Sequence, residues 1–300
     1  MKKLFFLFIF FLVGCTSNKQ IEFTDSECNL NWSLCTVYPD KSFTLINKQT
    51  IKIAILDSGI NEDHSSLEGL VTKSFNAINQ NESTKDLYGH GTAIAGIIAA
   101  KPNNYNVQGI SNSVELYDVK VLNDKGGGKI EDVISGIEWS INNDADIINL
   151  SFGFQKDDDY LRDAIRKASD KGITIVAASG NNLGLYTDYP AKYDEVISFS
   201  SVNKELKIDP LAGKGKVDYV APGVEIPILT NDEDQVRYVD GTSFAAAIGT
   251  GVIANILAES SNQLTQSEIK TKLTNISIDL GEKGKDTSYG YGLIQLKTNK

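Results

Sequence analysis

Short apolar runs alternate with segments of helical period along most of this chain. The runs are rich in β-branched residues and read IKIAIL (51–56), VELYDVKVL (114–122), DIINLSF (146–152), GITIVAA (172–178) and VISFSS (196–201). Ile130–Asn142 and Asp159–Lys171 instead have the apolar spacing of helices. This alternation is typical of βαβ units, and apolar strands between helices predict a parallel sheet covered on both faces. We therefore expect an α/β fold with three layers, a doubly wound, mostly parallel β-sheet flanked by helices.

A single large domain accounts for most of the length. About 250 residues follow the first 48, which is an ordinary size for one α/β domain. The chain is 41% hydrophobic and 9% aromatic, which argues for a folded core rather than disorder. The sequence contains no internal repeat, low-complexity tract or proline-rich linker that would mark a second domain. We expect a signal peptide at 1–14, an N-terminal extension at 15–48 and one domain at 49–300.

The charge balance of the chain argues against some partners. Its formal net charge at pH 7 is −10, with 39 acidic and 29 basic residues. Such a surface repels phosphate groups, so we expect neither a nucleic acid nor an anionic lipid surface as a partner of the folded protein. We expect the protein to be a monomer.

The first residues, MKKLFFLFIFFLVGCTSNK, have the layout of an export signal. Two lysines precede the apolar run Leu4–Val13, which ends just before Cys15. The run is about half as long as the ~20 residues that a membrane-spanning helix needs. Leu12–Cys15 resembles a bacterial lipobox, which implies cleavage before Cys15 and attachment of lipid, such as palmitate, to that residue. The alternative is an ordinary secretory signal with a chance cysteine. The lipobox predicts a membrane-anchored lipoprotein on the periplasmic or extracellular face of a bacterial membrane.

Two cysteines remain besides Cys15. Export would bring the chain into an oxidising compartment, where Cys28 and Cys35 could form a disulfide. Spacing alone does not fix loop geometry, so two free thiols remain the alternative. Neither cysteine has neighbours at the spacing of a zinc site, and the chain has only two histidines, so we expect no metal site.

Three short motifs carry the residue types of nucleophilic catalysis. AILDSGI puts Asp57 directly after an apolar strand, while YGHGTAIAGIIAA and DGTSFAAAIG put His90 and Ser243 at the starts of apolar helices. Each has an ordinary structural explanation: a turn for Asp57, a helix start for His90 and a helix N-cap for Ser243. Together they are the parts of a triad, in which histidine takes the serine proton and aspartate orients the imidazole.

Through these motifs the sequence resembles the subtilisin-like serine peptidases, whose triad has the same order. The resemblance covers about residues 51–296 through AILDSGI, GHGTAIAGIIAA, LYDVKVLNDKGGG, GIEWSINNDADIINLSFG, IVAASGNN, YVAPGVEI, GTSFAAA and YGYGLIQL. It implies the subtilisin-like fold, with Asp57 orienting, His90 as base and acid, and Ser243 as nucleophile. It also implies that the Asn181 amide and the Ser243 backbone N–H stabilise the oxyanion.

The resemblance also implies a substrate groove. Two segments would bind an extended peptide as an added strand, through main-chain hydrogen bonds that tolerate many sequences. Ile130 with Phe152 would line an apolar subsite, and Gly153 with Asn182 would border the primary specificity pocket. From the residues alone, these segments are ordinary turns and strand ends. The two segments are Gly126, Gly127 and Gly128, and Ser151, Phe152 and Gly153.

A few positions depart from the family pattern. Ala247 replaces the usual proline after the nucleophile, and Phe244 stands where methionine is common. Neither removes a catalytic group, so we expect activity to be retained. Ser66 replaces a calcium-binding aspartate, and a hard cation needs several oxygen ligands. We therefore expect no cofactor, although calcium stays possible in principle because Asn103 could supply one oxygen.

The segment before the domain is short for this family. Secreted relatives usually carry a folded pro-domain, which does not fit between Cys15 and the domain at 49–300. One alternative is that the domain folds unaided. The other, which we favour as a hypothesis, is that the extension, stapled by Cys28 and Cys35, packs on the body of the domain.

These features predict a serine endopeptidase that hydrolyses extracytoplasmic polypeptides through an acyl-enzyme intermediate, tethered to a membrane by its N-terminal lipid. The alternative is a catalytically silent relative that binds extended peptides without cutting them. Loss of a triad residue or of Asn181 would favour that alternative, and all four are present.

Overall fold

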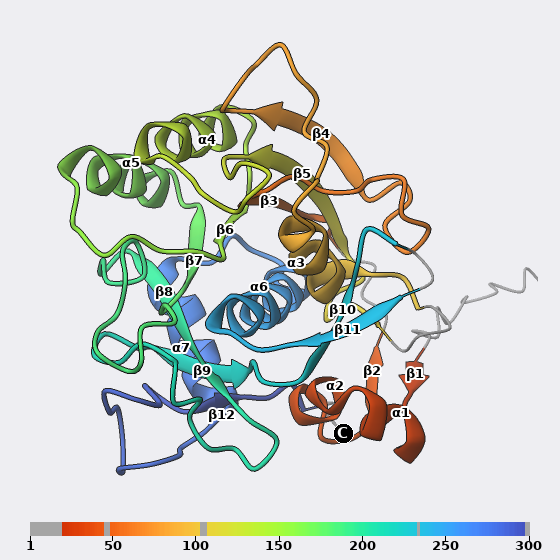
Figure 1. Ribbon diagram of the computed structural model, residues 1–300. Coiled ribbons are helices and arrows are strands. Elements are labelled where there is room, and N and C mark those ends of the chain that lie inside the picture. The colour runs from red at the N-terminus through yellow and green to blue at the C-terminus, as the bar shows by residue number, and fades with distance from the viewer. Residues whose placement is uncertain (1–19, 45–48, 103–106, 233–234, 298–300) are drawn as a thin grey trace, which may run out of the picture.

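A nine-stranded β-sheet forms the centre of the molecule (Figure 1). The computed structural model describes residues 20–44, 49–102, 107–232 and 235–297. The expected signal peptide, the lipidation site Cys15, and Asn103 therefore lie outside the described residues. The strand order is β12-β13-β9-β8-β7-β6-β3-β5-β4, and all neighbours pair in parallel except β12 with β13. The predicted α/β class with a mostly parallel sheet is confirmed.

Burial explains why the strands read as continuous apolar runs. Every residue of β6, β7, β8 and β9 is buried, as is all but the second residue of β3 and β5. A strand covered on both faces has no solvent side, so its sequence does not alternate. The sheet consists of β3 (Ile51–Asp57), β4 (Val71–Asn76), β5 (Val114–Lys120), β6 (Ile147–Leu150), β7 (Thr174–Ala178), β8 (Val196–Val202), β9 (Tyr219–Pro222), β12 (Ser277–Ile278) and β13 (Leu293–Ile294).

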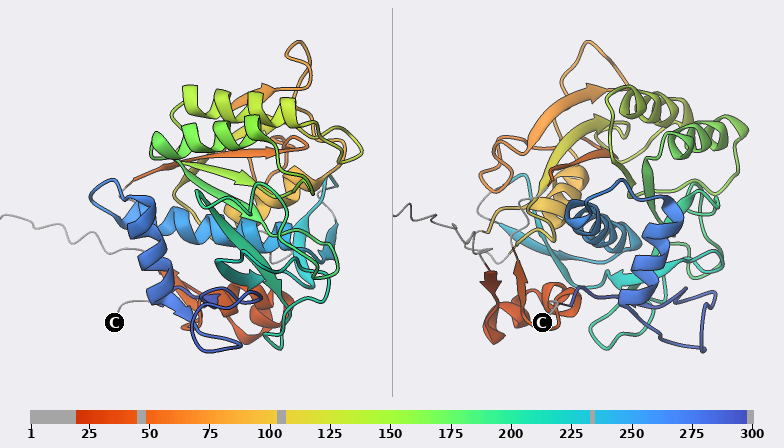
Figure 2. Two further views of the ribbon diagram at one scale, coloured as in Figure 1. Left: turned by 90° about the vertical axis from the view of Figure 1, so that its left-hand side faces the viewer. Right: turned by 180° about the vertical axis from the view of Figure 1, so that it is seen from behind.

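Helices cover both faces of the sheet, as Figure 2 shows. The helices α4 (Ile130–Asn142) and α5 (Asp159–Asp170) pack on one face. On the opposite face lie α3 (His90–Ala99) and α6 (Thr242–Glu259), and α7 (Gln266–Ile276) packs against α6 and β13. The periodicity predicted α4 and α5 to within one residue, because an amphipathic helix on the outside of the sheet keeps a polar face.

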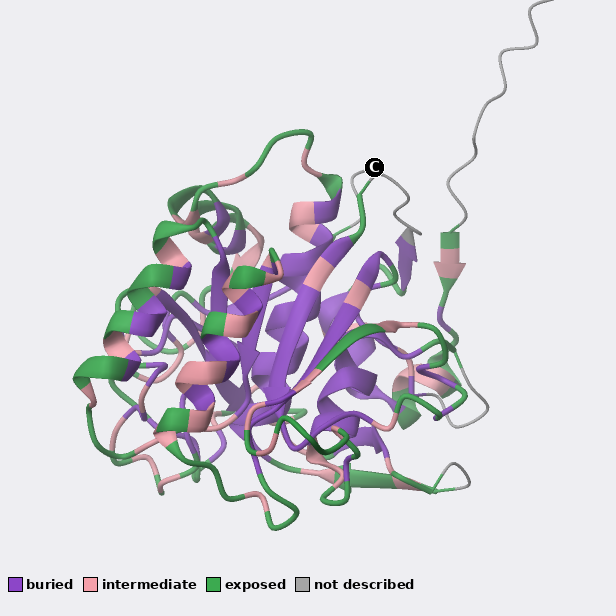
Figure 3. Ribbon diagram, turned by 90° about the horizontal axis from the view of Figure 1, so that it is seen from above, coloured by how far each residue is buried: buried purple, intermediate pink, exposed green. Residues whose placement is uncertain are grey.

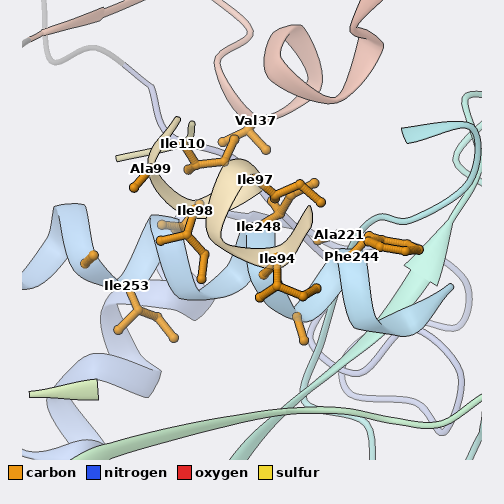
Figure 4. Close-up of a cluster of buried hydrophobic side chains, with 14 of the residues drawn as sticks. Val37, Ile94, Ile97, Ile98, Ala99, Ile110, Ala221, Phe244, Ile248 and Ile253 are labelled. Carbon is orange, nitrogen blue, oxygen red and sulfur yellow. The ribbon is translucent and has the colours of Figure 1, made fainter. Parts of the chain in front are cut away.

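The helix α6 is the innermost helix of the fold. By length and composition it could cross a membrane, but 78% of its apolar window is buried inside the protein. In Figure 3 the strands and the helices packed on them are coloured as buried through the middle of the molecule. Figure 4 shows Ile94 and Ile98 of α3 packed against Ile248 and Ile253 of α6. The long apolar run of α6 is therefore explained by the core.

The N-terminal segment packs on this core. It contains β1 (Gln20–Glu22), α1 (Asp25–Leu30), α2 (Trp32–Val37) and β2 (Ser42–Thr44), and a disulfide joins Cys28 to Cys35 across α1 and α2. Its largest side chains belong to the same buried cluster as α3 and α6: Phe23, Trp32, Leu34, Val37, Tyr38 and Phe43.

Hydrogen bonds join the N-terminal segment to several distant parts of the chain. Trp32 Nε1 donates to the Val224 carbonyl (3.0 Å), and Tyr38 Oη donates to the Ile110 carbonyl (2.6 Å). Near the C-terminus, the Leu296 N–H donates to the Val37 carbonyl (2.6 Å). These contacts make the segment part of the folded body.

A separate antiparallel hairpin lies beside α3. Its strands are β10 (Ile226–Leu229) and β11 (Val236–Val239), and β10 packs against α3. The hairpin leads directly into Gly241 and the first turn of α6. It thus joins the sheet to the helix that carries Ser243.

Candidate active site

Asp57 is held at the carboxyl end of a central strand. It is the last residue of β3, its side chain is 1% exposed, and Oδ1 accepts a hydrogen bond from the Ser58 N–H (2.8 Å). Because β3 lies between β5 and β6, the carboxylate emerges where ligands bind in open α/β sheets. The strand therefore presents a desolvated, oriented carboxylate.

His90 is the first residue of α3 and faces Asp57. Gly89 precedes it with φ 89°, a left-handed conformation that glycine adopts without strain. The ring Nδ1 lies 2.8 Å from Asp57 Oδ1 and 3.0 Å from Asp57 Oδ2. A carboxylate accepts hydrogen bonds, so Nδ1 carries the proton in this contact and Nε2 presents a lone pair. His90 is thereby set up as a base.

The surroundings of His90 favour its protonated form. Burial lowers the pKa of His90, but the charge and hydrogen bond of Asp57, with a further contribution from the charge of Asp86, outweigh burial and leave the pKa raised. An imidazolium formed by accepting a proton is therefore stabilised in place.

Asp86 is a buried carboxylate that the sequence analysis did not identify. Its Oδ1 accepts from the Ser58 hydroxyl (2.9 Å) and the Gly89 N–H (2.7 Å), and its Oδ2 accepts from the Thr92 N–H (2.9 Å) and hydroxyl (2.6 Å). Asp86 thus satisfies donors around the start of α3 and fixes the helix that carries His90. An acidic residue a few positions before an apolar helix is a capping signal that could have revealed it.

Ser243 lies within the first turn of α6, so the expectation that it is the N-cap is wrong. The N-cap is Gly241, whose φ of 149° and lack of a side chain let the chain turn sharply into the helix at Thr242. As the second helical residue, Ser243 has a backbone N–H without an intrahelical acceptor. The backbone N–H of Ser243 therefore lies at the positive end of the helix dipole.

The Ser243 hydroxyl is bonded away from the histidine in this structure. Its Oγ donates to the Ser151 carbonyl at 2.6 Å, and across the described residues no hydrogen bond joins it to His90. The ring of His90 nevertheless lies next to the same helical turn, with its centroid 5.8 Å from that of Phe244. The fold thus joins Asp57 to His90 and brings the imidazole beside the turn that carries Ser243.

The amide of Asn181 has one orientation. Its Oδ1 accepts from both the N–H and the hydroxyl of Thr242, each at 3.1 Å. A backbone N–H can only donate, so the oxygen faces Thr242 and the Nδ2 donors point outward from an exposed residue. A Cβ placed on Gly241 would lie 3.2 Å from Nδ2. The amide donors therefore lie at the corner from which the Ser243 N–H also emerges.

The two predicted substrate segments both reach this site. Gly126–Gly128 form a tight turn held by Asn123, and a Cβ on Gly126 would clash with the Tyr88 ring, two residues before His90. The other segment, Ser151–Gly153, follows β6 and carries the carbonyl that binds Ser243. Both segments thus approach the site from different strand ends.

A model of the subtilase family matches residues 48–292 of this chain. The chain belongs to the subtilase family. The minor extracellular protease Epr of Bacillus subtilis is 35% identical over 279 residues, which cover 91% of this chain and 42% of that protein. Subtilisin DY of Bacillus licheniformis is 34% identical over 252 residues, covering 82% of this chain and 89% of that protein. Subtilisin E of Bacillus subtilis is 34% identical and is covered over 65% of its length. The chain therefore spans less than half of the first relative and nearly all of the second.

A cavity of about 520 Å³ lies beside the histidine of this subtilase. It opens between the start of α3 and the β10–β11 hairpin and combines apolar with polar walls. Because it contacts His90 and Phe244, it is continuous with the site. Its lining residues are Tyr88, Gly89, His90, Ala93, Ile228, Leu229, Thr230, Asn231, Asp232, Gln235, Arg237, Val239 and Phe244.

The calcium position of the family is poorly matched in this subtilase. Ser66 is buried, its N–H donates to His64 Nδ1 (3.1 Å), and its carbonyl accepts from the Lys101 N–H (2.9 Å). A hydroxyl offers a cation no charge, whereas calcium prefers carboxylate and carbonyl oxygens. These residues do not fit a strong calcium site.

Asp188 is a second buried acid in the subtilase site that the sequence analysis did not identify. It is 9% exposed and lies between the exits of β6 and β7, where its N–H donates to the Ser179 carbonyl (3.0 Å) and the next residue, Tyr189, pairs with Phe154. Its Oδ1 accepts from Asn182 Nδ2 (3.2 Å). Burial raises the pKa of Asp188, partly offset by the hydrogen bond from Asn182. No local sequence pattern marks this position, because it is adjacent to the site only in the folded chain.

Proposed function

We propose that this chain is a serine endopeptidase in which Asp57, His90 and Ser243 form the triad and Asn181 stabilises the oxyanion. The observation that carries the proposal is the double contact of His90 Nδ1 with the Asp57 carboxylate, which orients Nε2 as a base beside the turn of Ser243. Membership in the subtilase family supports the same activity.

Nucleophilic attack needs a small rotation of the serine side chain. Turning about the Cα–Cβ bond moves Oγ from the Ser151 carbonyl towards the imidazole, and rotations of this kind are fast compared with turnover. His90 Nε2 then takes the hydroxyl proton as Oγ attacks the carbonyl carbon of the substrate, and the imidazolium gives the proton to the leaving amine. Water repeats the two steps on the acyl-enzyme.

The negative charge that develops on the carbonyl oxygen meets three favourable groups. The Asn181 Nδ2 and the Ser243 backbone N–H donate to it, and the N-terminal end of α6 adds a positive dipole. Substrate would bind as an extended strand between Gly126–Gly128 and Ser151–Gly153. The chemistry uses only side chains and backbone, so the proposed mechanism needs no cofactor.

The substrates we propose are polypeptides outside the cytoplasm. The apolar run before Cys15 and the lipobox-like residues around it support export and a lipid tether. The similarity to a protein named as extracellular agrees with export. Cys15→Ser should move the protein from the membrane to the soluble fraction of cells without changing its specific activity. A protein that stays in the membrane fraction would contradict the tether.

Labelling with a fluorophosphonate probe tests the peptidase proposal. The probe reacts with an activated serine, so the purified full chain should be labelled and the Ser243→Ala variant should not. The matched control is Ser151→Ala. It removes a neighbouring hydroxyl but keeps the backbone carbonyl that binds Ser243, and it should still be labelled.

Binding of peptides without cleavage is the second candidate. The bond from Ser243 Oγ to the Ser151 carbonyl is the specific observation in its favour, because the hydroxyl is not bonded to the base. A folded wild-type protein that binds extended peptides but resists labelling would establish this candidate and overturn the peptidase.

A further inference from the structure

The site contains a buried carboxylate that the proposed chemistry does not use. The Asp188 side chain forms no hydrogen bond with Asp57 or His90. Within the described residues, its only side-chain hydrogen-bond partner is the Asn182 amide. A carboxylate taken out of water without a cation is unfavourable, which agrees with the raised pKa of Asp188. Groups kept in this condition beside a reactive serine are often there for a ligand.

Two glycines leave room for the Asp188 carboxylate. A Cβ on Gly153 would lie 2.6 Å from Asp188 Cβ, and a Cβ on Gly180 would lie 2.1 Å from Asp188 Oδ2. Any side chain at either position would therefore collide with the acid. The Asp188 side chain thus lies between two backbone stretches that each place a glycine against it, Gly153 after β6 and Gly180 after β7.

These two stretches lead directly to the reacting groups. Gly153 lies two residues after Ser151, whose carbonyl binds Ser243 Oγ, and Gly180 immediately precedes Asn181. During attack, the carbonyl carbon of a substrate residue lies at Ser243 and its carbonyl oxygen at Asn181. The side chain of that residue then points along the segment after β6 or the segment after β7. The Asp188 side chain, which lies against Gly153 and Gly180, is therefore next to both of the segments that hold that carbonyl.

We infer that Asp188 selects substrates with a lysine or arginine at P1, the residue whose carbonyl is attacked. This inference rests on the proposed function and names the substrate class of the same site. The ammonium or guanidinium group would approach Oδ2, while Oδ1 keeps its bond to Asn182. The long aliphatic stem of either side chain would lie along the glycine backbone. The basic side chain supplies the counter-charge that the described part of the chain does not provide.

Matched peptides that differ only at P1 test the inference. Arginine is compared with citrulline, which has nearly the same shape without the charge, and with leucine and glutamate. For the purified full chain we expect kcat/KM to favour arginine over citrulline by roughly 30-fold or more, as for a charge pair that is largely desolvated. In Asp188→Asn the ratio should fall to a few-fold. A wild-type ratio near one, or an unchanged ratio in the variant, would overturn the inference.

Two further variants keep the test decisive. Asp194→Asn removes the same charge from an exposed position six residues away and should leave the ratio at the wild-type value. Asp188→Ser removes the charge together with the bulk of the side chain, so it replaces Asp188→Asn if that protein fails to fold. Equal losses of the ratio in Asp188→Asn and Asp194→Asn would show a general charge effect and contradict a specific site.

Binding to an inactive chain separates the inference from the proposed function. If the wild type resists the fluorophosphonate and cuts no peptide, the peptidase proposal fails, but the affinity of Ser243→Ala for the two peptides is still measurable. Tighter binding of the arginine peptide, lost in Ser243→Ala/Asp188→Asn, would support a basic-residue site in a binding protein. Equal affinity for the arginine and citrulline peptides would overturn the inference independently of catalysis.

Discussion

Hydrogen bonds with one neighbouring residue decide the orientation of each of two polar side chains in this site. Asn181 presents its donors outward only because Thr242 supplies two donors to its oxygen. His90 presents Nε2 to the site only because Asp57 binds Nδ1. In both cases a neighbour that is remote in sequence removes the ambiguity of a side chain with two different ends.

Replacement of Asn181 should affect the transition state more than binding. Asn181→Ala removes a donor to an oxyanion that forms only during reaction, so kcat should fall about 100- to 1000-fold with little change in KM. Asn181→Asp keeps an oxygen facing Thr242 but replaces the outward amide by a second oxygen, and should lose at least as much. Steady-state kinetics on one peptide measures both values. An effect confined to KM would contradict the assigned role.

The charge of Asp86 should be visible in the pH dependence of activity. His90 acts as a base only when neutral, and Asp86 is among the groups that raise its pKa. Asp86→Asn should therefore lower the pKa of His90 and move the acid limb of the kcat/KM profile to lower pH. The same variant should lower the free energy of unfolding by about 1–3 kcal/mol. The reason is that the new NH2 group would face hydrogen-bond donors instead of acceptors.

Thr92→Val is the matched control for the charge of Asp86. It removes one of the donors to the carboxylate but leaves its charge in place, so the acid limb should stay at the wild-type pH while stability falls. An acid limb that shifts equally in both variants would point to a distorted α3 instead of an electrostatic effect.

The helix α6 combines two functions that its sequence does not separate. Its first turn carries Ser243, while its remaining residues fill the core between α3 and the sheet. An apolar helix that is buried on nearly all sides has no clear amphipathic period. Periodicity therefore could not predict which neighbours α6 contacts. Gly241 as N-cap was also missed, because its role depends on a backbone conformation that neighbouring elements impose.

Two isoleucines of α6 should differ in their importance for stability. Ile248 is fully buried, so Ile248→Ala should cost about 2–5 kcal/mol of the free energy of unfolding through lost burial and a cavity. Ile256 is only partly buried, and Ile256→Ala should cost about 1 kcal/mol. Urea unfolding in a Ser243→Ala background, which prevents self-digestion, measures both. Equal losses would mean that α6 does not pack as described.

The N-terminal segment and the sheet form one body at the scale of the whole molecule. The disulfide closes only a short loop, so by chain entropy it adds about 2.5 kcal/mol. Six buried apolar side chains and the hydrogen bonds of Trp32 and Tyr38 contribute more to the attachment. We therefore expect the segment to unfold together with the domain.

The chain has two tryptophans, Trp32 in the N-terminal segment and Trp139 in the domain. Their fluorescence can therefore follow the unfolding of each region separately. Trp139 reports on α4 in the variant Trp32→Phe, and Trp32 reports on the N-terminal segment in Trp139→Phe. In a Ser243→Ala background, the fluorescence transition of each variant should coincide with its own loss of helical circular dichroism. A Trp32 transition that precedes the loss of helix would contradict a single cooperative unit.

The sequence by itself determined five central strands of the sheet (β3, β5, β6, β7 and β8), the helices α4 and α5, and the candidate triad with Asn181. These depend on local properties: apolar runs for buried strands, helical period for outer helices, and short motifs placed at strand ends. Only the tertiary structure revealed the bond of Ser243 to Ser151, the residues against which the N-terminal segment packs and the position of Asp188. Each depends on contacts between residues far apart in the chain. Whether a carboxylate is a solvated surface charge or a desolvated binding group is set by the elements that close around it.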